Sequence, residues 1–217
     1  MEHLSDEMKS SVLERITEFL KGEMSENRFS HTLGVKDEIT RMGEIYLQDE
    51  IFELQIAALL HDITKEYSVK KQLQLCERYG IMLDNGDLRS PQVIHSLTGA
   101  YVAYEKFPEL VTPKIAGAIY KHTLASEDMS LFDKLLFVSD FTESGRTNDF
   151  CVNVRNKFWQ NISKCASYEE KVHLLDEIII FSLDSTISKL LKSNSLISLR
   201  TVKARNKILE TFSSDTE

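Results

Sequence analysis

The first feature that could do chemistry is a His-Asp doublet at the end of an apolar run. Residues 57–60 are apolar and are followed directly by His61 and Asp62, with Lys65 three residues further on. A buried imidazole and a buried carboxylate both need partners. A metal ion supplies one, because imidazole nitrogen and carboxylate oxygen are ligands of Fe, Mn, Co and Zn. The alternative is a helix end with a solvated aspartate.

Further histidines extend this candidate site. The chain has six histidines; His3 lies in the N-terminal tail and His173 far downstream. The other four lie in segments of similar composition, with a small or hydroxyl residue nearby. These four are His31, His61, His95 and His122. A second apolar run, residues 135–138, leads to Asp140 as the first run leads to the doublet. The alternative for each histidine is a hydrogen-bonded core residue.

Four histidines and several aspartates on separate helices suit a one- or two-metal site inside a helical bundle. A bound divalent ion lowers the pKa of water to near neutrality and neutralises charge on a phosphoryl oxygen. Cations beside such ligands suit phosphate esters or anhydrides. The cations close to a candidate ligand in sequence are Arg28, Lys65 and Arg146. The residues alone therefore predict a metal-dependent phosphohydrolase, although spacing also allows Arg28 to be a solvated surface residue.

The candidate ligands are expected on or at the ends of helices. Ser25 can N-cap a helix that carries Arg28 and His31 on one face and runs to about residue 47. The next helix starts at Asp49 or Glu50 and ends at the doublet. Later helix starts place the remaining candidate ligands. Pro91 lies near the start of the helix with His95, and Thr112 with Pro113 starts the helix that ends at His122. Ser130 and Asp133, which resemble a capping box, start the helix that leads to Asp140. Residues 84–87 are expected to form a turn.

Helical periodicity also covers segments that carry no candidate ligand. We expect helices over about residues 6–21, 69–79, 169–191 and 199–212, and one that starts near residue 152. Gly22 is a plausible stop for the first of these. Trp159 and the apolar stripe of residues 169–191 are interpreted as core. The polar tail after residue 212 is expected to fray.

Composition excludes several classes of protein. The chain has 217 residues, 42% of them hydrophobic, with only three prolines and eight glycines, which favours long helices over an all-β fold. The formal net charge of −8 disfavours a nucleic-acid partner. Three cysteines without a CxxC pair, an acidic N-terminus and the lack of an apolar run long enough to cross a bilayer indicate a reduced, cytoplasmic protein without a membrane partner.

The order of these residues resembles the HD-domain metal-dependent phosphohydrolases. His31, the doublet of His61 and Asp62, and Asp140 stand in the order of the H…HD…D signature. Longer motifs narrow the resemblance to the bacterial symmetrical bis(5′-nucleosyl)-tetraphosphatases of the YqeK-like family. These motifs cover residues 28–35, 58–66, 95–100, 119–123 and 139–146. The doublet alone is a weak signal of this family, whereas five motifs in the family's order are a strong one.

The resemblance implies an all-α fold, the HD-domain helical bundle with a metal site in its core, and cleavage of diadenosine tetraphosphate to two ADP by a metal-activated water. It implies one or two transition-metal ions, iron first, with Mn, Co or Zn as alternatives. The implied metal ligands are His31, His61, Asp62 and Asp140, with His95 and His122 facing the phosphates or a second ion. The implied substrate contacts are Arg28, Asp62, His95, His122, Thr123, Asp140 and Arg146, to which spacing adds Lys65.

Two departures from the family pattern leave the implied ligands intact and concern only loop stiffness and fine substrate preference. Ser144 stands where the family often has Pro, and Lys121 stands where Arg is common. We divide the chain into an N-terminal helix at 1–24, the HD domain with its C-terminal helices at 25–195, and a C-terminal helix and tail at 196–217. The expected partner is a small-molecule dinucleoside polyphosphate or nucleotide, and a homodimer stays open.

Two other functions remain as alternatives. One is a different HD phosphohydrolase, acting on a nucleoside monophosphate, a deoxynucleotide or a cyclic dinucleotide; no Gly-Tyr-Pro follows the doublet, which counts against the cyclic dinucleotide. The other is a non-catalytic nucleotide-binding module that keeps the fold. The intact set of candidate ligands argues against this second alternative.

Overall fold

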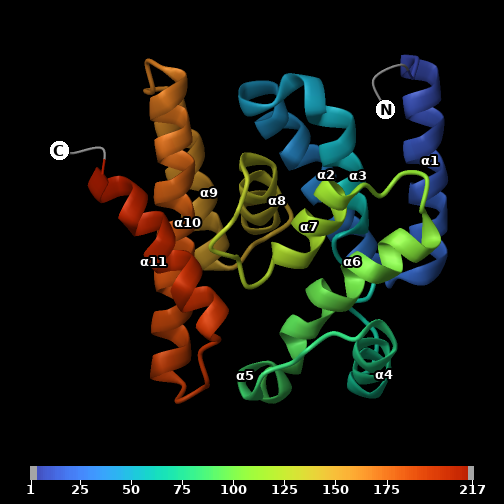
Figure 1. The fold of residues 1–217 in the computed structure, drawn as a ribbon. Coiled ribbons are helices and arrows are strands. Elements are labelled where there is room, and N and C mark those ends of the chain that lie inside the picture. The colour runs from blue at the N-terminus through green and yellow to red at the C-terminus, as the bar shows by residue number, and fades with distance from the viewer. Residues whose placement is uncertain (1–3, 215–217) are drawn as a thin grey trace.

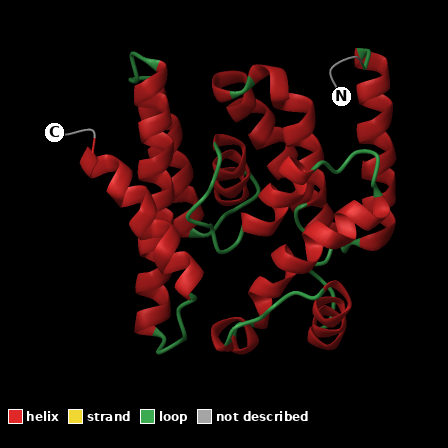
Figure 2. Ribbon diagram, viewed as in Figure 1, coloured by secondary structure: helices red, strands yellow, loops and turns green. Residues whose placement is uncertain are grey.

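The computed structural model describes residues 4–214, and within that range the regular secondary structure is entirely helical (Figures 1 and 2). The α-helices are α1 (Asp6–Glu23), α2 (Glu26–Tyr46), α3 (Ile51–Leu60), α4 (Val69–Tyr79), α5 (Asn85–Arg89), α6 (Ile94–Lys106), α7 (Pro113–Lys121), α8 (Leu131–Thr142), α9 (Asp149–Ile162), α10 (Tyr168–Lys192) and α11 (Leu199–Ser214). Short 3₁₀ turns cover Gln48–Glu50 and Pro91–Val93. The predicted all-α class is confirmed.

Side-chain caps fix where the site-bearing helices begin. The Ser25 hydroxyl accepts from the amide of Arg28 and starts α2, and the Thr112 hydroxyl with Pro113 at N1 starts α7. α8 begins with a reciprocal capping box, in which Ser130 and Asp133 each accept the other's backbone N–H. These predicted starts are confirmed. The caps of α7 and α8 therefore set the register of the candidate ligand at the other end of each helix, and the Ser25 cap sets the register of His31 near the start of α2.

α3 lies in the middle of the molecule because it is apolar on every side. Its residues from Leu54 onward are buried with the exception of Gln55, and it packs against α1, α2, α7 and α8. Figure 1 shows α9, α10 and α11 together on one side of this centre and α1 on the other. Gly99 of α6 lies against the segment that follows α3, where a Cβ would lie at a contact distance of 3.4 Å from the carbonyl oxygen of His61.

Several element boundaries differ from the expectation in instructive ways. The turn expected at residues 84–87 opens the short helix α5, because Asp84 and Asp87 form a second capping box. α1 continues past Gly22 to Glu23, and α9 starts at Asp149 because Asn148 caps it. α11 extends beyond residue 212, and residues 215–217 of the tail expected to fray lie outside the described residues.

Trp159 is partly buried and packs at the edge of the hydrophobic core. Its indole N–H donates to Glu38 Oε1 at 2.7 Å, and the Arg41 guanidinium lies 3.9 Å from the centre of its ring. The apolar stripe of α10 is buried as expected, through residues such as Leu175 and Ile178. None of the described helices has the length and apolar character needed to cross a membrane. The proposed division at residues 24 and 195, like the homodimer, stays a prediction.

Candidate metal centre

The structure brings the predicted metal and phosphate residues into one cluster at the meeting of α2, α3, α6, α7 and α8. His31 lies within α2, His61 and Asp62 directly follow α3, and His95 lies in the first turn of α6. His122 directly follows α7, and Asp140 lies in the last turn of α8. These side chains come from five separate helices, so the fold itself assembles the cluster.

Local backbone geometry orients three of the imidazoles. In His61, His95 and His122, Nδ1 lies 2.6 to 2.7 Å from the carbonyl oxygen three residues earlier. A carbonyl only accepts hydrogen bonds, so each Nδ1 must carry the proton. The lone pair of each ring is therefore on Nε2, the nitrogen that faces the centre of the cluster. This is the tautomer in which a histidine binds a metal through Nε2.

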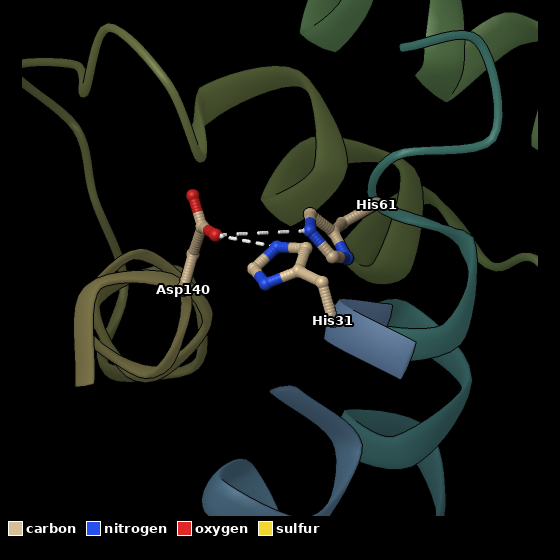
Figure 3. Close-up of side chains that lie close together, drawn as sticks. All are labelled: His31, His61 and Asp140. Carbon is tan, nitrogen blue, oxygen red and sulfur yellow. Dashed lines mark ion pairs between the residues drawn. The ribbon is translucent and has the colours of Figure 1, made fainter. Parts of the chain in front are cut away.

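One half of the cluster joins His31, His61 and Asp140 (Figure 3). Asp140 Oδ1 lies 3.0 Å from His31 Nε2 and 3.9 Å from His61 Nε2. Oδ2 of Asp62 lies 3.4 Å from His61 Nε2 and 3.7 Å from His31 Nε2. Ligand atoms of His31, His61 and Asp140 all lie within 4.8 Å of one another, close enough for one ion to contact all three.

The other half is built around the second oxygen of Asp62. Oδ1 of Asp62 lies 3.1 Å from His95 Nε2 and 3.7 Å from His122 Nε2. The two Nε2 atoms lie 3.1 Å from each other. Asp62 thus turns one oxygen to each pair of histidines. Its carboxylate can serve a single ion in the first half or bridge two ions.

Burial and unpaired atoms show that the donor set fits a cation. His61, Asp62 and His122 are at most 3% exposed. Among the described residues, His61 Nε2 and Asp62 Oδ1 have no hydrogen-bond partner. The Nε2 atoms of His95 and His122 face each other at 3.1 Å, and burial lowers the pKa of His95 to about 4, so His95 is neutral at neutral pH. A divalent transition metal resolves each of these features.

Both aspartates are ionised at neutral pH. Burial acts to raise the pKa of Asp62, but the neighbouring imidazoles, His61 first and then His122 and His95, hold it well below the usual value. Burial acts in the same direction on Asp140, and His31 with Arg146 outweighs it and holds the Asp140 pKa well below the usual value. The cluster therefore offers two carboxylates to a metal.

Cationic and hydroxyl groups surround the cluster. Arg28 Nη1 pairs with Asp62 Oδ2 at 2.6 Å, and Arg146 pairs with Asp140. Lys65 Nζ and Thr123 Oγ1 lie 3.2 and 3.1 Å from His95 Nε2. The Arg28 side chain is 23% exposed, so the alternative of a solvated surface arginine is wrong. Every residue singled out as a site candidate is thus in or beside the cluster.

A cleft of about 320 Å³ opens onto the first half of the cluster. It is lined by Ser25, Asn27, Arg28, His31, Glu66, Glu143, Gly145 and Arg146. Two of these carboxylates had no role in the sequence analysis. Glu66 accepts from the backbone and hydroxyl of Ser25, and Glu143 accepts from His31. The only sequence sign of Glu143 was its place three residues after Asp140 in a charged turn.

Comparison with known proteins places the chain in a family. The HD domain family matches residues 28–145, more than half of the chain. The chain therefore belongs to the HD domain family. The symmetrical bis(5′-nucleosyl)-tetraphosphatase of Halalkalibacterium halodurans is 26% identical over 192 residues, covering 88% of this chain and 94% of that protein. The enzyme of the same description from Bacillus subtilis is 26% identical over 178 residues, covering 81% and 86%.

A solved structure has the same fold. A crystal structure of an HD superfamily hydrolase from Clostridium acetobutylicum superposes with a TM-score of 0.77 at 24% identity, covering 91% of this chain and 97% of that one. The resemblance to the YqeK-like branch is confirmed at this level of similarity. The chain is an HD phosphohydrolase, and the HD domain implies a divalent metal in the cluster described above.

Proposed function

We propose that the protein cleaves diadenosine tetraphosphate symmetrically to two ADP. The observation that carries this proposal is the convergence of four imidazole nitrogens and two carboxylates beside two arginines that line one cleft. The two tetraphosphatases that match over most of this chain support the choice of substrate. Symmetrical cleavage leaves an equal nucleoside diphosphate on each side of the bond that breaks.

The metal ligands in this proposal are His31, His61, Asp62 and Asp140, with His95 and His122 completing the second half. The bound metal supplies Lewis acidity, which lowers the pKa of water and offsets charge on phosphoryl oxygens. We propose iron first, with Mn, Co or Zn as alternatives, because imidazole and carboxylate ligands suit each of these ions.

The cationic side chains would hold the polyphosphate. Arg28 and Arg146 line the cleft from α2 and from the turn after α8, so they can grip phosphate oxygens from two sides. Each is already paired with an aspartate, which fixes its position before substrate arrives. Lys65 and Thr123 lie beside His95 and would contact phosphate oxygens in the second half.

Product analysis tests the proposal directly. The metal-free protein would be incubated with diadenosine tetraphosphate and Fe(II) under anaerobic conditions, or with Mn(II) or Co(II), and the nucleotides separated. ADP as the sole product is expected. ATP together with AMP would contradict symmetrical cleavage while keeping a metal hydrolase. Faster cleavage of a nucleoside monophosphate than of the tetraphosphate would support the alternative HD phosphohydrolase.

Variants separate metal binding from substrate binding. Asp62→Ala should lose metal and activity together, because a ligand is lost. Arg146→Ala should keep the metal and raise KM or lower kcat, because a phosphate contact is lost. Arg205→Ala is the matched control, since Arg205 pairs with Asp184 on the α10–α11 side of the molecule. Full activity of Asp62→Ala would show that the metal site is misassigned.

A further inference from the structure

His31 is oriented differently from the other three histidines of the cluster. His61 and His122 directly follow helices, where the last carbonyls have no partner within the helix and can accept from Nδ1. His95 uses a carbonyl of the preceding 3₁₀ turn. His31 lies inside α2, where the helix already uses the carbonyls of the preceding turn. Its Nδ1 therefore needs an acceptor from elsewhere.

Glu143 provides that acceptor. Its Oε1 lies 3.0 Å from His31 Nδ1, on the opposite side of the ring from the Nε2 that faces Asp140. Glu143 follows α8 directly and is 2% exposed. A buried carboxylate of this kind, bonded to Nδ1, fixes the ring plane and leaves the lone pair on Nε2.

The carboxylate is itself held in place by the turn that follows α8. The amide of Gly145 donates to Glu143 Oε2 at 2.5 Å. Arg155 of α9 donates to the backbone carbonyls of Glu143 and Arg146, which fixes the turn from behind. Both carboxylate oxygens therefore have defined partners, one on His31 and one on the backbone.

Two glycines leave the room that this carboxylate occupies. A Cβ on Gly34, one turn after His31 in α2, would overlap with Glu143 Oε2, and a Cβ on Gly145 would lie 2.9 Å from the same oxygen. Glycine inside a helix is unfavourable relative to alanine. The glycine at position 34 is explained by the Glu143 carboxylate, which occupies the space that a side chain there would take and so reaches His31.

We propose that Glu143 is a positioning residue of the metal centre: it holds His31 with the proton on Nδ1 and directs Nε2 at the metal. This inference rests on the proposed assignment of His31 as a metal ligand. Loss of a partner that orients a ligating histidine typically weakens metal affinity about 10- to 100-fold. We expect a loss of that size for Glu143→Ala, and a smaller one for Glu143→Gln, whose amide oxygen can still accept from Nδ1.

Metal affinity gives the first test, because it does not depend on the substrate. Co(II) or Mn(II) would be titrated calorimetrically into metal-free wild type, Glu143→Ala, Glu143→Gln and Gly34→Ala. Gly34→Ala should weaken binding like Glu143→Ala, because its Cβ displaces the carboxylate while every metal ligand remains. Gly117→Ala is the matched control, since a Cβ at that helical position in α7 meets nothing within 4 Å.

The tautomer of His31 gives a second test in the metal-free protein. Long-range ¹H–¹⁵N spectra at alkaline pH distinguish an imidazole with its proton on Nδ1 from one with its proton on Nε2. Two carboxylates compete for this proton, since Glu143 Oε1 and Asp140 Oδ1 each lie 3.0 Å from one ring nitrogen. Wild type should therefore carry the proton partly on Nδ1, and Glu143→Ala should shift the population toward Nε2. If the substitutions acted only by loosening the turn after α8, Glu143→Gln and Glu143→Ala would change the tautomer population of His31 to the same extent.

The outcomes separate this inference from the assignment on which it rests. His31→Ala must lose metal affinity; if it does not, both the ligand assignment and the positioning role are overturned. If His31→Ala loses affinity while Glu143→Ala and Gly34→Ala keep wild-type affinity and tautomer, the positioning role alone is overturned. If Glu143→Ala does not fold, Gly34→Ala decides the question.

Discussion

Metal binding at Asp62 should be visible as thermal stability. An ion that binds only the folded protein stabilises it by about 2.7 kcal/mol when its free concentration is 100 times Kd. For a domain of about 150–250 residues, each kcal/mol raises Tm by about 2–4 °C. We therefore expect metal to raise the Tm of the stripped protein by about 5–11 °C.

The structure predicts that Asp62→Ala removes most of this shift. One Asp62 oxygen lies 3.4 Å from His61 Nε2 and the other lies 3.1 Å from His95 Nε2, so the substitution takes a ligand from both halves of the cluster. A 100-fold loss of affinity at the same metal concentration leaves only about 0.4 kcal/mol of stabilisation, or about 1–2 °C.

Differential scanning fluorimetry would measure this on protein stripped with a chelator and then supplied with Mn(II), Co(II) or Zn(II). Asp37→Ala is the matched control, because Asp37 is an exposed aspartate on α2 and its side chain is 73% accessible. The reasoning is refuted if the wild type shows no shift with any of these ions, or if Asp62→Ala shifts as far as Asp37→Ala does.

Other predictions concern stability and titration. Leu54→Ala should cost about 2–5 kcal/mol in urea unfolding, because Leu54 is fully buried in α3; a cost below about 1 kcal/mol would contradict the packing described. Arg200→Ala should cost about 1–3 kcal/mol in the same assay, because Arg200 pairs at 3.5 Å with the fully buried Asp87. Burial, the hydrogen bond that the Tyr79 hydroxyl donates to Glu105, and the negative charge of Glu105 raise the pKa of Tyr79 to about 12. Glu105→Gln should therefore lower this pKa toward about 10 in a tyrosinate absorbance titration against a Tyr79→Phe reference. Because unfolded Tyr79 ionises near pH 10, its contribution to stability should be lost as pH rises from about 10 to about 12; a Glu105→Gln variant with the wild-type titration would refute this.

The sequence predicted much of the candidate site because the proposed ligands stand at points that local rules define. His61 and His122 directly follow helices with buried apolar residues, and the start of α7 is marked by the Thr112 cap and Pro113, whereas α3 begins without a side-chain cap. A histidine just past a buried helix stays near the core, so its place in the cluster follows from where the helix ends. The same rule placed Asp140, whose helix begins at the Ser130 capping box.

What the sequence did not predict depends on contacts between distant segments. The choice of Glu143 as acceptor for His31 requires α8 and α2 to be packed already, and no local pattern encodes that pairing. The arrangement of Asp62 between two pairs of histidines is likewise a property of five helices together. The short helix α5 was missed because a turn-rich sequence and a capping box use the same residue types.

The two ways of orienting histidines have a consequence for the order in which the centre can form. Nδ1 of His61, His95 and His122 finds its acceptor three residues away, so these rings are directed as soon as the local chain takes shape. His31 finds its acceptor 112 residues away. Closing a loop of that length is slow and entropically costly compared with forming a helix turn. Full metal affinity therefore requires α8 to be docked on α2, and comparing the rate of metal uptake in a refolding chain with the rate of helix formation would time that docking.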